Sequence, residues 1–314
     1  MSESIPSPRW DHEITLPAPR QNRDVTFSHR IESLVMKGLM SLFRSQPIEK
    51  ASARMAGFMN ILGPMLFPIH RRGHQNLQLI YPDMTAAERS AILRGAWKNL
   101  GATVAEFAHL DKLYDRVTLH GEEHLTPLIE TGQRAIFVSG HFANWEAMAI
   151  TLYQKELKYA VVYRAANNPL VDAEIIERRG DVMSRRQIPK GPSGARDLIK
   201  VLKENLSICM LVDQKLNDGI SVPFLGHEAM TAPATARLAL KENLPIIPIQ
   251  IVRKPDAYFD MTLHPPLEVV KSGDIKKDVE TATAMINEKL GEFILNRPDQ
   301  WLLFHRRWPR RLTG

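Results

Sequence analysis

The chain has 314 residues, of which 44% are hydrophobic, and its 41 Lys and Arg against 35 Asp and Glu give a formal net charge of +6. This length and hydrophobic content suffice for one large core, and we expect one main domain with a helical appendage. The charge excess selects no partner, since anionic substrates, an anionic membrane surface and nucleic acid would all fit it. The single cysteine, Cys209, lies in the apolar run 208–211, which excludes a disulfide framework and predicts a buried thiol.

The N-terminal region divides into a polar part and a helical part. Residues 1–30 contain four prolines and show no regular period, which predicts a loosely attached leader without a secretory signal. Residues 31–70 show helical spacing and carry flanking arginines and lysines. The uncharged stretch 55–69 is shorter than the roughly 20 residues of a spanning helix and is broken by two prolines. We expect residues 31–70 to lie on an anionic membrane surface, with simple packing against the main domain as the alternative.

The rest of the chain, residues 71–314, alternates short apolar runs with amphipathic segments. Strands are predicted at 134–139, 158–163, 206–212, 245–252 and 258–263, and helices at 88–110, 144–154, 168–179, 193–204, 232–242 and 276–295. Near-continuous apolar strands that alternate with helices are typical of a buried parallel sheet. The prediction is therefore an α/β fold with a mostly parallel sheet flanked by helices.

The chemically most informative stretch is His141-Phe-Ala-Asn144-Trp-Glu146, which follows a predicted strand and precedes a helix. Loops at the carboxyl ends of parallel strands are where open α/β sheets bind ligands. Residues five apart in one helix would point about 140° away from each other, so His141 must lie in the turn and Glu146 must reach back to it. A carboxylate against one imidazole nitrogen leaves the other free as a general base.

No protein nucleophile accompanies this base. Ser139 lies on the adjoining strand, and the chain contains no Gly-x-Ser-x-Gly elbow. A base and its orienter without a nucleophile indicate that the substrate's own hydroxyl attacks directly. The alternative is that His141 is a helix-capping residue without a chemical role.

The His141-x-x-x-x-Glu146 stretch resembles the His-x-x-x-x-Asp/Glu box of the glycerolipid acyltransferase superfamily. The wider chain, from about Arg71 to Arg307, is similar to the lipid A biosynthesis branch, the lauroyl and myristoyl acyltransferases that act on Kdo-lipid A precursors. The matching stretches, in order, are Val161-Val162-Tyr163-Arg164 with Asn168-Pro169-Leu170, Arg178-Arg179-Gly180, Leu211-Val212-Asp213-Gln214, Val222-Pro223-Phe224-Leu225-Gly226 with Thr231, and Trp301-x-x-x-His305-Arg306-Arg307-Trp308.

Two features depart from the pattern of this branch. Its members usually carry an N-terminal membrane-spanning helix, whereas the corresponding stretch here is short and broken by proline. The third box commonly reads Asp-x-Asp, whereas Lys215 stands at the second acidic position. The departures weaken the case for integral membrane attachment and for a paired carboxylate.

The resemblance implies transfer of a fatty acyl chain from acyl-acyl carrier protein to a hydroxyl of a lipid A precursor, at the cytoplasmic face of the inner membrane. It implies no cofactor, no metal and no nucleic-acid partner. A glycerol-phosphate or lysophospholipid acyltransferase is the alternative enzyme. A non-catalytic basic protein that binds a membrane or nucleic acid is the alternative of another class.

The resemblance also implies roles for individual residues. His141 would be the general base and Glu146 its orienter. Asn144 or nearby backbone N–H groups are candidate oxyanion donors. A helix N-cap is the alternative role of Asn144. Arg164 and Arg179 are expected to bind phosphate, and Asp213 to orient one of them.

The last segment, Trp301 to Arg311, is both basic and aromatic. This mixture is typical of membrane interfaces and of nucleic-acid binding. It could also dock the acidic carrier protein or form a solvated tail.

Overall fold

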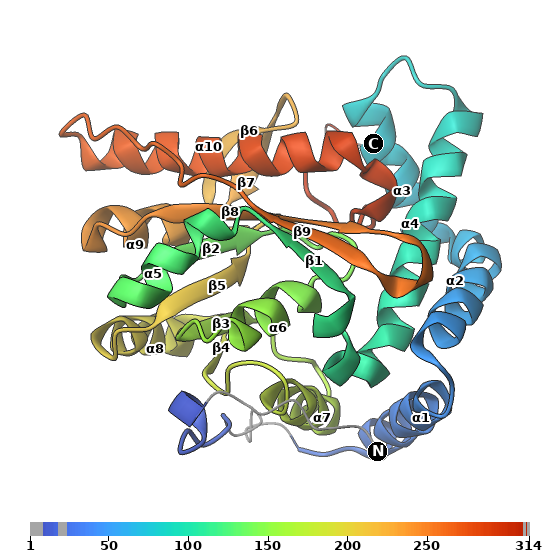
Figure 1. Cartoon of the computed structure of the whole chain (residues 1–314). Helices are drawn as coiled ribbons and strands as arrows, with labels where there is room; N and C mark the ends of the chain where they lie inside the picture. The colour runs from blue at the N-terminus through green and yellow to red at the C-terminus, as the bar shows by residue number, and fades with distance from the viewer. Residues whose placement is uncertain (1–8, 18–23, 310–311, 313–314) are drawn as a thin grey trace.

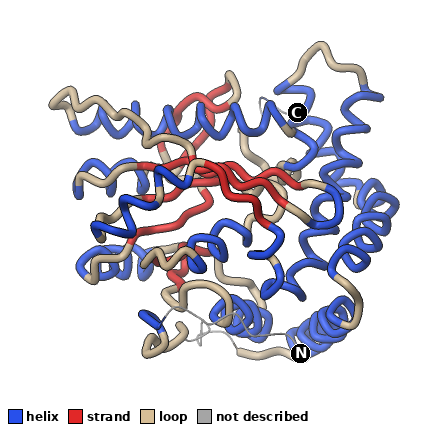
Figure 2. The backbone as a smooth tube through the Cα atoms, viewed as in Figure 1, coloured by secondary structure: helices blue, strands red, loops and turns tan. Residues whose placement is uncertain are grey.

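The computed structural model describes residues 9–17, 24–309 and 312. A seven-stranded sheet runs through the middle of the protein, with helices on both sides (Figures 1 and 2). Its strands are β1 (Val117–His120), β2 (Ile136–Ser139), β3 (Tyr159–Tyr163), β4 (Gln187–Pro189), β5 (Ser207–Leu211), β8 (Ile246–Arg253) and β9 (Phe259–Leu263). The strand order is β1-β9-β8-β2-β5-β3-β4, and all neighbours are parallel except β8 and β9. The predicted mostly parallel α/β fold is confirmed.

The apolar character of the predicted strands follows from their burial on both faces. In β2, Ile136 and Val138 contribute to one hydrophobic cluster and Phe137 to another. Side chains alternate between the faces of a strand, so a strand covered on both sides must be apolar throughout. Cys209 in β5 is fully buried, as predicted, and burial raises the pKa of its thiol.

Helices and a hairpin cover this sheet. The helices that follow the first strand are α5 (Thr126–Thr131), α6 (Glu146–Gln154), α7 (Pro169–Gly180), α8 (Pro192–Lys203), α9 (Ala234–Glu242) and α10 (Ile275–Asn296). The hairpin consists of β6 (Ile220–Phe224) and β7 (His227–Thr231), joined by Leu225 and Gly226, which both have positive φ. Sequence reasoning missed this hairpin and strands β1 and β4, because short or half-exposed strands have no continuous apolar run.

Four N-terminal helices stand together beside the sheet (Figure 1). They are α1 (Phe27–Arg44), α2 (Ile48–Met65), α3 (Phe67–Ile80) and α4 (Ala86–Glu106). Helix α4 begins at a capping box, in which Thr85 and Glu88 cap each other's backbone. Helix α2 lies so close to α4 that a side chain at Gly63 would overlap the Trp97 ring. Within the described ranges, no helix combines the length and apolarity that crossing a membrane requires.

The expected leader, residues 1–30, is described only in part, since residues 1–8 and 18–23 lie outside the described ranges. Where it is described, it contacts the main domain. Asp11 is buried and accepts hydrogen bonds from the Tyr153 hydroxyl (2.7 Å) and the Arg185 backbone N–H (2.9 Å). The helical region begins at Phe27, a few residues earlier than its period indicated.

In its described part, residues 301–309, the C-terminal aromatic segment is mostly buried and is not a solvated tail. Trp301, Arg307 and Trp308 are each at most 2% exposed. The Arg307 guanidinium lies 4.3 Å from the centre of the Phe224 ring, and it donates to the Met230 carbonyl and the Thr231 hydroxyl. The sequence indicated a surface role because the cations and aromatic rings are visible in it, whereas the residues that pack around them are not. Residues 310–311, part of the expected tail, lie outside the described ranges.

A buried ion pair connects the N-terminal helices to the sheet. Arg253, the last residue of β8, forms a two-pronged pair with Glu106 at the end of α4, whose side chain is fully buried. The Arg253 guanidinium also donates to Asn99 (2.7 Å) and Thr103 (2.9 Å). Ser52 of α2 donates to the same Glu106 carboxylate (2.7 Å). The Glu106 carboxylate is therefore removed from water with its hydrogen-bonding capacity filled, while the Arg253 side chain is mostly buried.

This network holds the loop after β2 in an unfavourable backbone conformation. Ala143 has φ of +45°, a region that residues with a Cβ seldom adopt. Its carbonyl accepts hydrogen bonds from Asn99 (3.1 Å) and Thr103 (2.8 Å), and its N–H donates to the Gln300 carbonyl (2.9 Å). Three hydrogen bonds, two from α4 and one from the turn that contains Gln300, thus compensate the local strain.

We predict that Glu106→Gln lowers the free energy of unfolding by about 3–5 kcal/mol, because it leaves the buried Arg253 guanidinium without its counter-charge. Urea unfolding followed by circular dichroism measures the change. The matched control is Glu204→Gln, which breaks the exposed pair with Arg186 and is expected to cost about 1 kcal/mol or less. Equal losses in both variants would contradict the role of the buried pair.

Candidate active site

His141 lies in the bend after β2 and is held by Asp213, which follows β5. The His141 Nδ1–H donates to Asp213 Oδ1 (2.7 Å), and the His141 backbone N–H donates to Asp213 Oδ2 (3.0 Å). The strands are parallel neighbours with Ser139 opposite Leu211, so residues two positions beyond each strand end come side by side. The register of the sheet therefore places this carboxylate against this imidazole.

The Asp213 carboxylate is fully buried and saturated with donors. Trp301 donates its indole N–H to Oδ2 (2.8 Å). Burial by itself would raise the pKa of Asp213, but the interaction with His141 and the hydrogen bonds from His141 and Trp301 lower it well below its ordinary value. A Cβ at Gly140 would lie 2.7 Å from the Phe142 ring and 3.2 Å from Asp213 Cβ. Glycine thus permits the close approach of the two loops.

Glu146 does not orient His141, which corrects the sequence expectation. Its carboxylate faces Arg179 of α7, whose Nε donates to Oε2 (2.9 Å) and whose Nη2 donates to Oε1. The Trp145 indole N–H donates to the same carboxylate (3.0 Å). Glu146 is the first residue of α6, so its side chain extends from the helix and away from the bend that carries His141. Asp213, not Glu146, holds the His141 ring. The sequence had predicted that Asp213 would orient an arginine.

Asn144 also differs from its expected role as an oxyanion donor. It is fully buried, and its amide donates to Glu106 (2.9 Å). Its side-chain oxygen accepts from the backbone N–H of Glu146 (3.1 Å), at the start of α6. The alternative reading, a helix cap, describes this geometry, and no N–H of the Asn144 amide is directed at a substrate.

The exposed side of His141 faces a cavity of about 240 Å³. Its polar rim contains cations from successive strand ends, Arg164 after β3 and Lys190 after β4, together with Arg179. Burial lowers the pKa of Lys190. The apolar wall is built from Met148, Ala149, Val161, Val162, Met183, Cys209, Met210 and Leu211. The cavity thus combines a base, a cationic rim and an apolar interior.

Arg164 is exposed and forms no ion pair with any described residue, so its charge is available to a ligand. Arg179 is different, because Glu146 already neutralises it. Two arginines were expected to bind phosphate. Among the described residues Arg164 has no ion-pair partner, whereas Arg179 is paired with Glu146.

Two further side chains lie against His141. The Gln214 amide nitrogen is 3.3 Å from His141 Nε2 and 3.0 Å from His305 Nε2. Gln214, His305 and Trp301 belong to the stretches that match the family, but the sequence predicted no contact between them and His141 or Asp213. The position of Gln214 after a predicted strand was the available signal. No sequence pattern indicated that the loop containing His305 would lie at this site.

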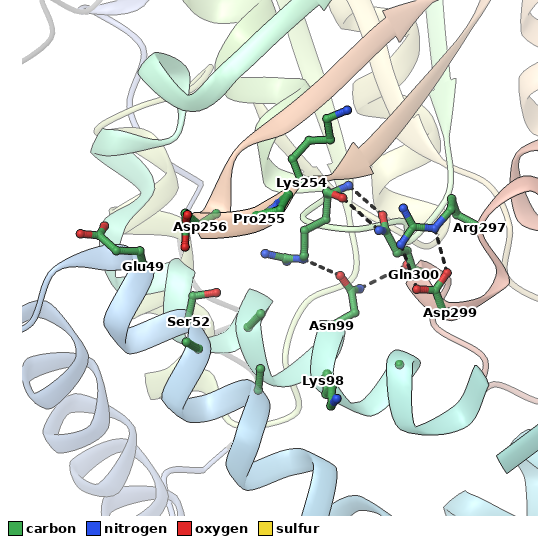
Figure 3. Close-up of a pocket in the computed structure, with 16 residues that line it drawn as sticks. Glu49, Ser52, Lys98, Asn99, Lys254, Pro255, Asp256, Arg297, Asp299 and Gln300 are labelled. Atoms are coloured by element: carbon green, nitrogen blue, oxygen red, sulfur yellow. Dashed lines mark hydrogen bonds and ion pairs between the residues drawn. The ribbon is translucent and has the colours of Figure 1, made fainter. Parts of the chain in front are cut away.

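A larger cavity, of about 490 Å³, lies between α2, α4 and the turn after β8 (Figure 3). Asn99 and Gln300 line its wall, where the Asn99 amide donates to the Gln300 carbonyl (3.2 Å). It contains neither His141 nor Asp213. We therefore place the active site at the smaller cavity, because only that one contains the base.

A histidine held by a buried carboxylate at the carboxyl edge of a parallel sheet lies where α/β enzymes bind their ligands. The chain belongs to the bacterial lipid A biosynthesis acyltransferases, since the model of that family matches residues 21–310. The protein is thus an acyltransferase, and the resemblance noted in the sequence is confirmed.

Individual relatives agree with this assignment. The lipid A biosynthesis lauroyltransferase of Escherichia coli (strain K12) is 26% identical over 251 residues, covering 77% of this chain and 79% of the relative. The myristoyltransferase of the same strain is 24% identical over 265 residues, covering 80% and 78%. Among solved structures, the 1-acyl-sn-glycerophosphate acyltransferase of Thermotoga maritima has a TM-score of 0.36 and 15% identity, covering 83% of this chain and 97% of that one.

We predict that His305 makes the protein less stable as the pH falls. Burial, followed by the charge of His141, lowers the pKa of His305 to about 4. The unfolded chain, with an ordinary histidine pKa of about 6.5, then binds more protons, so stability is lost as the pH falls from about 6.5 towards 4. His305→Gln should reduce the loss measured between about pH 7 and pH 5 by roughly 1–2 kcal/mol.

Urea unfolding at the two pH values measures this difference. The control is His120→Gln, which removes a histidine from an exposed position. A His305→Gln variant whose stability falls as steeply as that of the wild type would show that His305 is protonated normally in the folded protein.

Proposed function

We propose that the protein transfers a fatty acyl chain from acyl-acyl carrier protein to a hydroxyl of a Kdo-lipid A precursor, with His141 as the general base. The observation that carries the proposal is the alignment of His141 by the buried Asp213, with its other nitrogen facing a cavity of apolar interior and cationic rim. A fatty chain fits the apolar wall, and the phosphates of a lipid A precursor match the cations.

The proposed reaction needs no nucleophile from the protein. His141 Nε2 removes the proton from the acceptor hydroxyl as its oxygen attacks the thioester carbonyl carbon. Asp213 stabilises the imidazolium that results. When the carbonyl re-forms, the C–S bond breaks and the imidazolium returns the proton to the thiolate. Ser139, the nearest hydroxyl in sequence, donates to the Ile249 carbonyl (2.7 Å) and is fully buried.

The polar side chains around the base divide into binding and supporting roles. Arg164, which is exposed and unpaired among the described residues, would bind a phosphate of the precursor. Glu146 and Arg179 would form a fixed wall of the cavity beside His141. Asn144 would act by joining α6 to Glu106.

We further propose that α1 attaches the enzyme to the cytoplasmic face of the inner membrane. One side of this helix exposes large apolar side chains, among them Phe27 (78% exposed) and Leu34 (72%). Two exposed cations, Arg30 and Lys37, lie on the same helix. A row of exposed apolar side chains with nearby cations is the composition of a helix that lies in an anionic membrane interface.

We predict that His141→Ala and Asp213→Asn each lower turnover by roughly 10²- to 10⁴-fold, the range of general-base catalysis. Glu146→Gln should cost less, because its carboxylate faces Arg179. The assay supplies acyl-acyl carrier protein with a Kdo-lipid A precursor or with lysophosphatidic acid, and mass spectrometry identifies the product.

Ser139→Ala is the control and should retain near-normal turnover, because its hydroxyl only bonds a backbone carbonyl. Acylation of lysophosphatidic acid alone would support the alternative enzyme. Absence of transfer to either acceptor by the wild type would overturn the proposed function, and normal turnover by His141→Ala would overturn the mechanism.

We predict that replacing Phe27 and Leu34 by serine weakens binding to phosphatidylglycerol vesicles by about tenfold or more, because each buried side chain of this size contributes about 1.5–3 kcal/mol. Flotation of the protein with the vesicles measures binding. Val270→Ser is the matched control, since Val270 is 79% exposed but lies outside α1. Equal binding by all three proteins would exclude α1 as the attachment site.

A further inference from the structure

The proposed reaction creates a negative charge on the thioester oxygen, and the structure offers one side-chain amide to receive it. Asn144 is excluded, because it is fully buried and does not line the cavity. Gln214 lines the same cavity as His141 and immediately follows Asp213. An amide N–H directed at a developing oxyanion is among the strongest contributions to acyl transfer.

The position of the Gln214 amide suits this task. Its nitrogen lies 3.3 Å from His141 Nε2 and 3.4 Å from His141 Nδ1. Nearly equal distances to both ring nitrogens place the amide over the imidazole ring, away from the in-plane direction of the Nε2 lone pair. The amide is therefore beside the point of attack, and the acceptor hydroxyl would take over the contact with Nε2 when substrate binds.

His305 fixes this amide. Its Nε2 is 3.0 Å from the Gln214 nitrogen, and its backbone carbonyl is held by the Asn76 amide (2.8 Å). Because burial keeps the pKa of His305 at about 4, its ring is neutral at physiological pH and accepts one N–H from Gln214. An amide nitrogen carries two hydrogens, and Gln214 bonds no described residue other than His141 and His305. The second hydrogen therefore faces the His141 ring, where a substrate oxygen would replace that contact.

We propose that Gln214 donates to the oxyanion of the tetrahedral intermediate and that His305 is the positioning residue that holds it there. This inference rests on the proposed function. As the hydroxyl oxygen bonds to the thioester carbon and its proton passes to His141, the carbonyl π electrons move to the oxygen, which accepts the Gln214 N–H. The electrons return as the C–S bond breaks, and the thiolate takes the proton from His141.

The first test separates rate from binding. Gln214→Leu is expected to lower kcat by about 10²- to 10³-fold with little change in KM, since the oxyanion exists only after attack. Gln214→Glu, which has the same shape but places a carboxylate beside the developing charge, should lose at least as much. The control is Gln133→Leu, an exposed glutamine just before β2, at the opposite edge of the sheet.

The second test is a double-mutant cycle between Gln214 and His305. His305→Ala should lower kcat in the wild-type background but not in the Gln214→Leu background, because His305 acts through the amide. The pH profile of kcat/KM should keep its midpoint in Gln214→Leu while its plateau falls. Urea unfolding of each variant confirms that the comparison is made on folded protein.

The outcomes separate this inference from the proposed function. Absence of acyl transfer by the wild type would overturn the proposed function. Wild-type transfer that His141→Ala abolishes but Gln214→Leu leaves intact would overturn only the oxyanion role. A shifted pH midpoint with an unchanged plateau would show that Gln214 tunes His141 instead, and additive losses in the cycle would overturn the role of His305.

Discussion

The buried ion pair between Glu106 and Arg253 is the interaction on which the active site depends. A charge pair removed from water adds little net stability by itself, but it tolerates no missing partner. Arg253 ends β8, the neighbour of β2, and Glu106 ends α4. The pair therefore fixes the helical bundle against the carboxyl edge of the sheet, at the strand next to the catalytic loop.

Hydrogen bonds connect this ion pair to the loop that carries His141. Glu106 accepts from Asn144, and the Asn99 and Thr103 side chains hold the carbonyl of Ala143 in its left-handed conformation. These hydrogen bonds fix the backbone conformation of the loop, and in this conformation His141 faces Asp213. A strained bend held by the core costs stability but keeps the imidazole ready in one orientation, as general-base catalysis requires.

The two carboxylates near the histidine have distinct environments and distinct roles. Asp213 is buried among donors and faces the imidazole, so its charge is directed at the base. Glu146 faces Arg179, and the two neutralise each other at the cavity wall. The exposed apolar side of α1 belongs to the same N-terminal bundle that the ion pair fixes to the sheet. In the proposed function, the helix that attaches to the membrane is therefore packed, through this bundle, against the sheet that carries the active site.

The sequence by itself determined five strands of the sheet and the position of His141 at the end of one of them. Apolar runs predicted β2, β3, β5 and β8, because strands buried on both faces must be apolar throughout. Strand β9 was also predicted, although its buried residues alternate with partly exposed ones. The turn between β2 and α6 followed from the spacing of His141 and Glu146. Only the tertiary structure decided which carboxylate serves the base. Asp213 lies 72 positions beyond His141, and the two meet because β5 inserts beside β2 in a register that pairs Ser139 with Leu211. Strand order and register depend on the packing of the whole sheet, which no local pattern records, and the same holds for the enclosure of Trp301 and Arg307.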